Sequence, residues 1–511
     1  MTFDVARTLW SRLRQAMTIP QQTGKGRDRE SLAVGMILCA FFLDLAINVH
    51  EGEYDAVALF WLTIAAFVCF AAITLHLGPA VEEFLQRRFS VIVAVLAFIC
   101  ACILLYQSRN DIEISLSVVV LAVLGVLQVS NLGSMRTPLF VVLVTGFCLV
   151  SVINFTSPQR AKYPKIDVFL FQQSAADALR HGQDPYAIRF PNIYNGDNSR
   201  VFEDPHRYGP GVKVYGPGVV DDNGYITYGF PYTPLSLLMV MPAYVLGGDC
   251  RFAIVAAMGV SALLMFAARP GRRAALIALL FLVNPQGFFV INMSWTEPLL
   301  LLNFSLIMFC ACRWRKGLPW ALGLFFATKQ YTVLAVPLLL LLVEGPNLFK
   351  ELLKMVAKIA LVVAVTNVPF FVWNPHEFIR AVVQWQLVQP FRRDALSYLV
   401  WLYNHNGGAK APMWTPFLIV IPAIIFAIKR CSHTPAGFAA AIAFIYLIFF
   451  AFNKQAFCNY YYFVIGAACW SVAAMRSEFD RTSPAIGAAA IVAAVGGALS
   501  SFTLCRTLAP F

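Results

Sequence analysis

The sequence predicts an all-α protein that crosses a membrane many times, and three observations carry this prediction. Of the 511 residues, 59% are apolar and 13% charged, whereas soluble proteins contain roughly 45–50% and 25%. The apolar residues form blocks of roughly 17–22, the length of a helix that spans a bilayer core. Most of the Lys and Arg residues behind the net charge of +12 lie in short loops between these blocks. Such loops orient membrane helices, so we expect no nucleic-acid partner and about 13–15 transmembrane segments.

Residues 1–30 predict a cytoplasmic segment that lies on the membrane surface. The stretch from Phe3 to Met17 is amphipathic, and basic residues such as Arg7 and Arg12 accompany it. No small-residue cleavage site stands beside a short apolar core, so a signal peptide is not expected.

Five apolar spans are expected before the only long loop, at residues 31–48, 56–75, 89–107, 114–129 and 138–155. The connecting loops alternate between acidic and basic, which fits the positive-inside rule with a cytoplasmic N-terminus. The loop at residues 156–233, rich in Gly, Pro, Tyr and Asn, is then expected on the non-cytoplasmic face.

Further spans are expected after the loop, at residues 252–268, 274–291, 298–312, 318–328, 331–343, 353–373, 414–428, 437–452, 460–475 and 485–502. The apolar segment 234–246 is short, and it has two interpretations, a span and a re-entrant segment. Residues 318–343 form either one long helix or two short ones that meet at Lys329 and Gln330. Two are favoured, because one span would place Arg313, Arg315 and Lys316 outside unless segment 234–246 also crosses. We divide the chain into N-terminal transmembrane helices (31–137), a transmembrane module that contains the long loop (138–475), and a C-terminal helix and tail (476–511).

The cysteines and the standard nucleotide motifs support no cofactor. The twelve cysteines form no C-x-x-C pair and are absent from the long loop, which argues against a disulfide framework and a zinc site. Walker A, G-x-G-x-x-G and H-E-x-x-H motifs are absent as well. We expect neither a metal nor a cofactor.

Residues 165–182 predict an amphipathic helix at the membrane surface, ended by Gly182 and the turn at Asp184, Pro185 and Tyr186. Asp167 stands at the start of this helix and has two interpretations. It can cap the helix by accepting backbone N–H bonds, which spacing alone favours. Alternatively, partial desolvation raises its basicity and makes it a proton acceptor.

Several cations are expected on the same outer face. Lys329 interrupts an apolar stretch far from the basic loops, and it either snorkels to the interface or binds an anion. Lys454 has the same two interpretations, while the Arg392–Arg393 doublet is more often solvated. One carboxylate with several cations suits sugar transfer from a phospho-lipid donor, in which a base deprotonates the acceptor hydroxyl and cations stabilise the departing phosphate. The donor's polyprenyl tail would lie in a groove between helices.

Five short motifs occur in the order typical of one family. They are Asp167-Val168-Phe169 with Ala175 to Leu179, Gly182 to Tyr186, Tyr228 to Pro234, Ala327 to Gln330, and Asn453 to Phe457. With these motifs the sequence resembles the membrane glycosyltransferases of the GT-C superfold. Within them it is most similar to glycosyltransferase family 87, the bacterial polyprenyl-phosphate-mannose-dependent α-mannosyltransferases.

The resemblance implies an inverting transfer at the periplasmic face of the bacterial inner membrane. It involves a polyprenyl-phosphate-linked sugar and a lipid or glycan acceptor. It also implies roles for individual residues: Asp167 as catalytic base; Lys329, Lys454 and Arg392 as phosphate contacts; Gln330, Gln455, Glu297 and His405 as sugar or acceptor contacts; and Tyr186, Pro231 and Pro234 as loop-shaping residues.

Two departures from the family's layout keep other functions open. In GT-C proteins the catalytic loop commonly follows the first transmembrane helix, whereas five spans precede it here, and no Asp-x-Asp or Glu-x-Asp pair accompanies Asp167. One alternative is a secondary transporter or lipid-linked sugar flippase, for which Asp44 is the main acidic residue inside a span. Another is an O-antigen ligase or polymerase-like enzyme with a diphosphate-linked glycan donor, in which Arg392 and Arg393 are central.

Overall fold

The computed structural model describes residues 29–107, 115, 119, 123, 125, 127–128, 135–156, 164, 166–194, 214–215 and 218–476. The predicted surface segment before residue 29, most of the predicted span 114–129 and the predicted span 485–502 lie outside the described residues. The predicted domain boundaries at 137 and 475 stay predictions.

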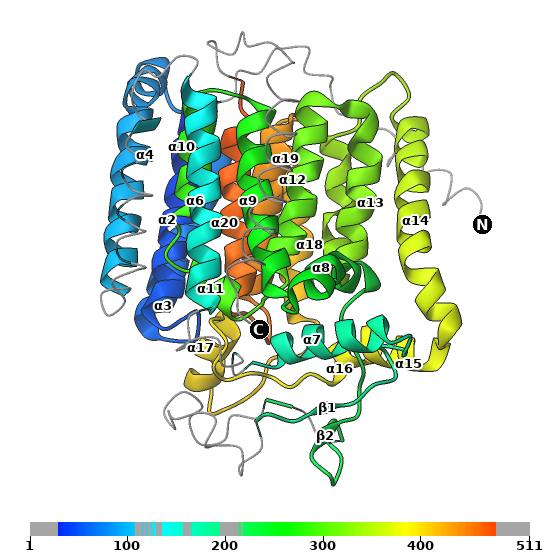
Figure 1. Cartoon of the computed structure of the whole chain (residues 1–511). Coiled ribbons are helices and arrows are strands. Elements are labelled where there is room, and N and C mark those ends of the chain that lie inside the picture. The colour runs from blue at the N-terminus through cyan, green and yellow to red at the C-terminus, as the bar shows by residue number, and fades with distance from the viewer. Residues whose placement is uncertain are drawn as a thin grey trace, which may run out of the picture.

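The protein is an all-α polytopic membrane protein, as predicted (Figure 1). Its helices are, in chain order, α2 (Glu30–Val49), α3 (Ala56–Thr74), α4 (Pro79–Gln107), α6 (Arg136–Thr156), α7 (Asp167–Arg180), α8 (Pro234–Gly247), α9 (Arg251–Ala268), α10 (Arg272–Leu282), α11 (Gly287–Asn292), α12 (Glu297–Arg313), η3 (Arg315–Gly317), α13 (Leu318–Thr328), η4 (Gln330–Leu341), α14 (Leu348–Trp373), α15 (Pro375–Ile379), η5 (Arg380–Gln384), α16 (Trp385–Val388), α17 (Tyr398–His405), α18 (Thr415–Arg430), α19 (Pro435–Ala451) and α20 (Cys458–Ala473). The described strands, β1 (Phe190–Pro191) and β2 (Tyr225–Ile226), form one short antiparallel pair.

Among the described residues, six helices are long and apolar enough to cross a membrane: α2, α3, α4, α6, α9 and α14. Shorter helices, including α12, α13, α19 and α20, stand beside them in one bundle (Figure 1). Helices suit this setting because they satisfy every backbone hydrogen bond within the segment. The helices α7, α15, α16 and α17 and the two strands gather at one end of the bundle (Figure 1).

Burial divides the bundle into a centre and a lipid-facing border. Helices α19 and α20 lie at the centre, because nearly every residue of both is buried. In α14, by contrast, only Ile359 and Phe370 are buried, and large apolar side chains of α3, α4, α14 and α18 are exposed. Apolar surface of this kind is stable against lipid tails.

Two breaks within expected spans and one helix that does not cross the bundle shape the end of the bundle where α7 lies. Residues 318–343 form two segments, α13 and η4, as predicted, and Lys329 between them is extended. The expected span 274–291 is broken between α10 and α11 by the turn that contains Asn284. Helix α8 begins and ends on the α7 side: Tyr186 Oη donates to Tyr232 O near its start (3.0 Å), and Gln173 Nε2 donates to Gly248 O at its end. Because both ends lie on that side, α8 does not cross the bundle, which agrees with the re-entrant interpretation.

The helices before residue 137 belong to the same body as the rest. Helix α2 packs against α3, α4 and the central α20, and α4 packs against α10. The loop between α2 and α3 ends at Asp55, whose carboxylate caps α3 by accepting from the backbone N–H of Val57 (2.7 Å) and Ala58. This cap fixes where α3 begins and holds the loop at the end of the bundle where α7 lies.

Candidate functional site

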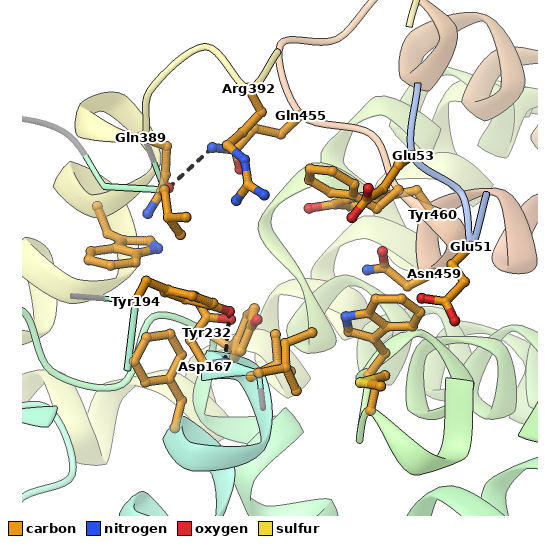
Figure 2. A pocket seen from close by; sticks show the side chains of 18 of the residues that line it. Glu51, Glu53, Asp167, Tyr194, Tyr232, Gln389, Arg392, Gln455, Asn459 and Tyr460 are labelled. Carbon is orange, nitrogen blue, oxygen red and sulfur yellow. Dashed lines mark hydrogen bonds between the residues drawn. The ribbon is translucent and has the colours of Figure 1, made fainter. Parts of the chain in front are cut away.

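A cavity of about 420 Å³ opens among the loops at the α7 end of the bundle. Segments far apart in the sequence line it: the α2–α3 loop, the start of α7, the loop before α8, the α11–α12 turn, the α13–η4 break, the segment from α16 to Arg392, and the α19–α20 loop. Its polar and charged lining residues include Lys329 and Gln386. Figure 2 labels the others: Glu51, Glu53, Asp167, Tyr194, Tyr232, Gln389, Arg392, Gln455, Asn459 and Tyr460.

Helix α7 is the predicted amphipathic surface helix, and it carries Asp167 into the cavity. The helix runs from Asp167 to Arg180, and Gly182 follows with φ of 72°, the left-handed conformation that favours glycine at a helix end. Its apolar face, with Phe169 and Phe171, packs on the bundle. Gln172 Nε2 donates to Ser294 O and so ties α7 to the α11–α12 turn. Asp167 is therefore fixed at the cavity wall by the seating of the whole helix.

Ile166 occupies the N-cap position, and Asp167 is the first residue of the helix. The Asp167 carboxylate accepts a hydrogen bond from the Val168 backbone N–H and also lies beside the phenols of Tyr215 and Tyr194. Tyr215 Oη donates to Asp167 Oδ2 (2.9 Å), and the Asp167 backbone N–H donates to Tyr194 Oη (3.1 Å). Burial raises the pKa of Asp167 above its usual value, while the Tyr215 hydrogen bond and the nearby Arg392 charge act to lower it. Burial also raises the pKa of Tyr215, so its phenol stays protonated and keeps donating.

Lys329 reaches the cavity as half of a buried ion pair. Its Nζ lies 2.5 Å from Glu297 Oε1, and the two side chains are 5% and 0% exposed. The ammonium also lies 4.9 Å from the ring centre of Tyr232 and 5.8 Å from that of Tyr460, within cation–π range. The second oxygen of Glu297, Oε2, is buried with no hydrogen-bond partner among the described residues. Glu297 thus acts on Lys329 and does not line the cavity.

Arg392 lines the cavity opposite α7 and is held from two sides. Its Nε donates to Asp394 Oδ1 (2.8 Å), and its guanidinium lies 4.9 Å from the ring centre of Phe457. Lys454 stands behind this wall: its Nζ donates to the backbone oxygens of Gln389 (2.6 Å) and Gln386 (3.3 Å), and burial lowers its pKa. Lys454 therefore braces the segment from Gln386 to Arg392 and is not itself a lining residue.

The remaining residues named from the sequence are placed differently. Gln455 lines the cavity and donates to Gln389 Oε1 and Pro390 O. Gln330 does not line it, because its amide donates to Pro231 O (3.0 Å) and Val382 O (3.1 Å). His405 also lies outside the lining; its ring is exposed and stacks on Trp401. Among the described residues, no group of three or more His, Cys, Asp or Glu side chains is arranged to hold a metal ion.

Tyr186, Pro231 and Pro234 lie in the loop between α7 and α8. Tyr186 is fully buried, its ring packs against Phe378 (4.9 Å between ring centres), and its hydroxyl donates to Tyr232 O. Pro231 O accepts from both Gln330 and Gln386, and Pro234 is the first residue of α8. These contacts hold Tyr232 in place at the cavity.

Substitution of Gly229 tests how tightly this loop is packed against the rest of the protein. A Cβ at position 229 would lie 1.9 Å from the backbone oxygen of Tyr186, so Gly229→Ala must push two backbone segments apart. We expect it to destabilise the protein by roughly 1–3 kcal/mol, as overpacking does, and to lower the melting temperature measured in detergent. At Gly78 a Cβ meets nothing within 4 Å, so Gly78→Ala is the control. Equal melting of the two variants would refute the close packing.

The sequence interpretation missed part of the cavity. Glu51 and Glu53 belong to the acidic loop between the first two expected spans, which served only to orient the helices. Tyr194 and Tyr215 were not predicted as functional residues. Two carboxylates within three residues, in a short loop on the same expected face as Asp167, were the available indication of a functional role.

Comparison with known proteins gives one remote likeness. No model of a known protein family matches the chain, and no characterised protein matches it in sequence. Among solved structures, the chain is similar to ArnT from Cupriavidus metallidurans, crystallised with undecaprenyl phosphate bound. The TM-score is 0.43 and the identity 20%, and the match covers 71% of this chain and 63% of that one. A likeness of this size assigns neither a family nor an activity, and the chain spans less than two thirds of the ArnT chain.

Proposed function

We propose that this protein is a membrane glycosyltransferase that takes a sugar from a polyprenyl-phosphate donor and passes it to a hydroxyl of a lipid or glycan. One observation carries the proposal: a desolvated carboxylate, Asp167, shares one cavity with the two cations Lys329 and Arg392 at the end of a bundle whose helices are long enough to span a membrane. A base and an anion-stabilising group within one cavity are what this transfer requires.

The proposed reaction uses each group once. Asp167 takes the proton of the acceptor hydroxyl as the acceptor oxygen forms its bond to the anomeric carbon of the donor. The bond between that carbon and the phosphate oxygen breaks on the opposite side, which inverts the configuration. The electron pair leaves with the polyprenyl phosphate, and the cations Lys329 and Arg392 stabilise its added negative charge.

Both cations are already paired with a carboxylate, and this shapes the proposal. Lys329 is bound to Glu297, and Arg392 is bound to Asp394. A cation that is paired with a carboxylate keeps its orientation when no ligand is bound. Its N–H groups are therefore in place before the donor binds, and the side chains need little rearrangement during the reaction. Tyr232 and Tyr460, which line the same region, add a polarisable wall around Lys329.

The finer assignments stay part of the proposal. The ordered motifs support a GT-C glycosyltransferase, and mannose is the sugar that the family 87 resemblance implies. The outward orientation is supported by the path of α12, which begins at Glu297 beside the cavity and ends at Arg313, close in sequence to Arg315 and Lys316. Cations at that far end fit a cytoplasmic location, which leaves the cavity facing the periplasm.

Reconstitution tests the proposal directly. The full-length protein is placed in liposomes with radiolabelled polyprenyl-phosphate mannose, and glucose- and arabinose-linked donors are run in parallel with a membrane lipid extract as acceptor. We expect a new labelled glycoside with at least one donor. Movement of label across the bilayer without a new product would instead support a flippase or transporter, and it would contradict the proposal.

The hydrogen bond from Tyr215 to Asp167 predicts a pH effect. Transfer requires the Asp167 carboxylate, so the rate falls as pH drops through the raised pKa of this group and it gains a proton. Because the Tyr215 bond favours the charged form, Tyr215→Phe raises the pKa of Asp167 further and moves the acidic limb of the rate profile to higher pH. The exposed Tyr225 on β2 gives the control Tyr225→Phe. An acidic limb that stays in place in Tyr215→Phe would refute Asp167 as the titrating base.

A further inference from the structure

We infer that the side of the cavity facing Asp167 is a subsite for a neutral sugar ring, and that the loop before α3 supplies its carboxylates. This acidic subsite consists of Glu51 and Glu53 from the α2–α3 loop together with Asn459 and Trp295. Figure 2 shows Glu51, Glu53 and Asn459 grouped with Tyr460 across the cavity from Asp167. The inference rests on the proposed function and specifies which chemical group the cavity holds there.

The α2–α3 loop is fixed to the rest of the site by its backbone. Gly52 has φ of 80° and sits so close to α20 that a Cβ would lie 2.3 Å from the backbone nitrogen of Cys458. On the other side, Glu53 forms a β-bridge with Ala395, and the Tyr54 N–H donates to Asp394 O (2.8 Å). The loop is therefore held between α20 and the segment that carries Arg392. Its fixed backbone determines where the carboxylates of Glu51 and Glu53 lie.

Asn459 is an independent indication of a ligand. Its side chain is 6% exposed and lines the cavity, yet its amide has no hydrogen-bond partner among the described residues. Trp295, 8% exposed, also lines the cavity, and its indole N–H is likewise without a partner in the described part of the chain. Both residues are buried as a whole, and their amide and indole N–H groups are open only where they line the cavity. A bound group that both donates and accepts hydrogen bonds would supply partners for them.

The chemistry of these side chains defines that group. Carboxylates accept hydrogen bonds, an amide both donates and accepts, and an indole donates one bond and offers a flat apolar face. Hydroxyls on a sugar ring match the polar groups, and the C–H face of the ring matches the indole. A phosphate or carboxylate would be repelled by Glu51 and Glu53 and drawn toward Lys329 and Arg392. The carboxylates of Glu51 and Glu53 therefore favour a neutral polyol over an anion at their own part of the cavity.

Ligand-observed NMR tests the subsite without requiring turnover. The full-length protein in nanodiscs is mixed with methyl α-mannoside, methyl α-glucoside or glucose 6-phosphate. We expect a neutral glycoside to bind the wild type and glucose 6-phosphate to bind more weakly. In Glu51→Gln/Glu53→Gln, which keeps side-chain size, we expect glycoside affinity to fall at least about fivefold and the discrimination against phosphate to shrink. Glu83→Gln, on the exposed start of α4, should change neither quantity.

Two results of the binding experiment would overturn the inference. One is unchanged glycoside binding and unchanged discrimination in a Glu51→Gln/Glu53→Gln protein that melts like the wild type. The other is the absence of glycoside binding to the wild-type protein. Asn459→Leu provides a second variant, which should weaken glycoside binding without altering the charge of the cavity. Both results come from binding experiments that do not depend on the transfer assay. The subsite can therefore be refuted while the proposed function holds, and the proposed function can be refuted while the subsite holds.

Kinetics then identify the substrate to which the ring belongs. If Glu51→Gln/Glu53→Gln raises KM for the lipid-linked donor alone, the subsite holds the donor sugar. If KM rises for the acceptor alone, it holds the acceptor. Either outcome supports the subsite, whereas an unchanged KM for both substrates contradicts it.

Discussion

Asp167→Asn is expected to lower the transfer rate by about 10³-fold or more while the protein still folds. General-base catalysis contributes typically 10²–10⁴-fold, and the amide that replaces the carboxylate cannot accept the acceptor's proton. The substitution preserves shape and leaves an oxygen to receive the Tyr215 hydrogen bond. The melting temperature should therefore change little, and the loss should appear in kcat rather than in donor binding.

Asp177→Asn is the matched control for this variant. Asp177 lies on the same helix, α7, but on its exposed side, where it accepts from Tyr244 Oη (2.6 Å). We expect this variant to transfer sugar at close to the wild-type rate. Near-normal turnover of Asp167→Asn would remove Asp167 from the reaction, and an equal loss in Asp177→Asn would point to disturbance of the helix instead.

Lys329→Met is expected to have the second-largest effect, because it removes both a proposed phosphate contact and the partner of a fully buried carboxylate. Breaking a buried ion pair from one side costs about 3–5 kcal/mol, since the remaining charge is left uncompensated. Glu297 is 0% exposed and its Oε2 already lacks a partner among the described residues. We expect a large drop in melting temperature and loss of transfer. Lys358→Met, on the exposed side of α14, should melt like the wild type.

The double variant Lys329→Met/Glu297→Gln separates the two roles of Lys329. Removing both charges avoids the uncompensated carboxylate, so most of the lost stability should return. The phosphate contact stays absent, so transfer should remain low and KM for the donor high. If the double variant regains transfer along with stability, Lys329 has a structural role only, and the phosphate contact must be sought at Arg392.

The sequence predicts the bundle well because its signals are local. Hydropathy and the basic loops locate most of the described spans, and the two-segment structure around Lys329 follows from the charge of the loop at Arg313. The surface helix that begins at Asp167 is likewise predicted from its own pattern. The spans and the surface helix depend on the residue pattern of a single helix, and the two-segment prediction adds only the charge of the connecting loops.

The cavity is predicted less completely because long-range contacts assemble it. The β-bridge between Glu53 and Ala395 joins segments more than 300 positions apart. The sequence of either segment does not predict that it pairs with the other. Glu297 and Gln330 were expected at the sugar, yet their polar atoms are used by Lys329 and by backbone oxygens. A polar residue near the end of a span can form hydrogen bonds either with a ligand or with a neighbouring residue. The sequence does not distinguish these two cases.

A cryo-EM map of the full-length protein with polyprenyl phosphate bound would test the central claim most directly. We predict density for the phosphate inside the cavity, within hydrogen-bond distance of Lys329 Nζ or the Arg392 guanidinium and on the same side of the bundle as Asp167. The polyprenyl chain should leave the cavity between helices. Phosphate density at the opposite end of the bundle, or outside the cavity, would contradict the assignment of this cavity as the site of sugar transfer.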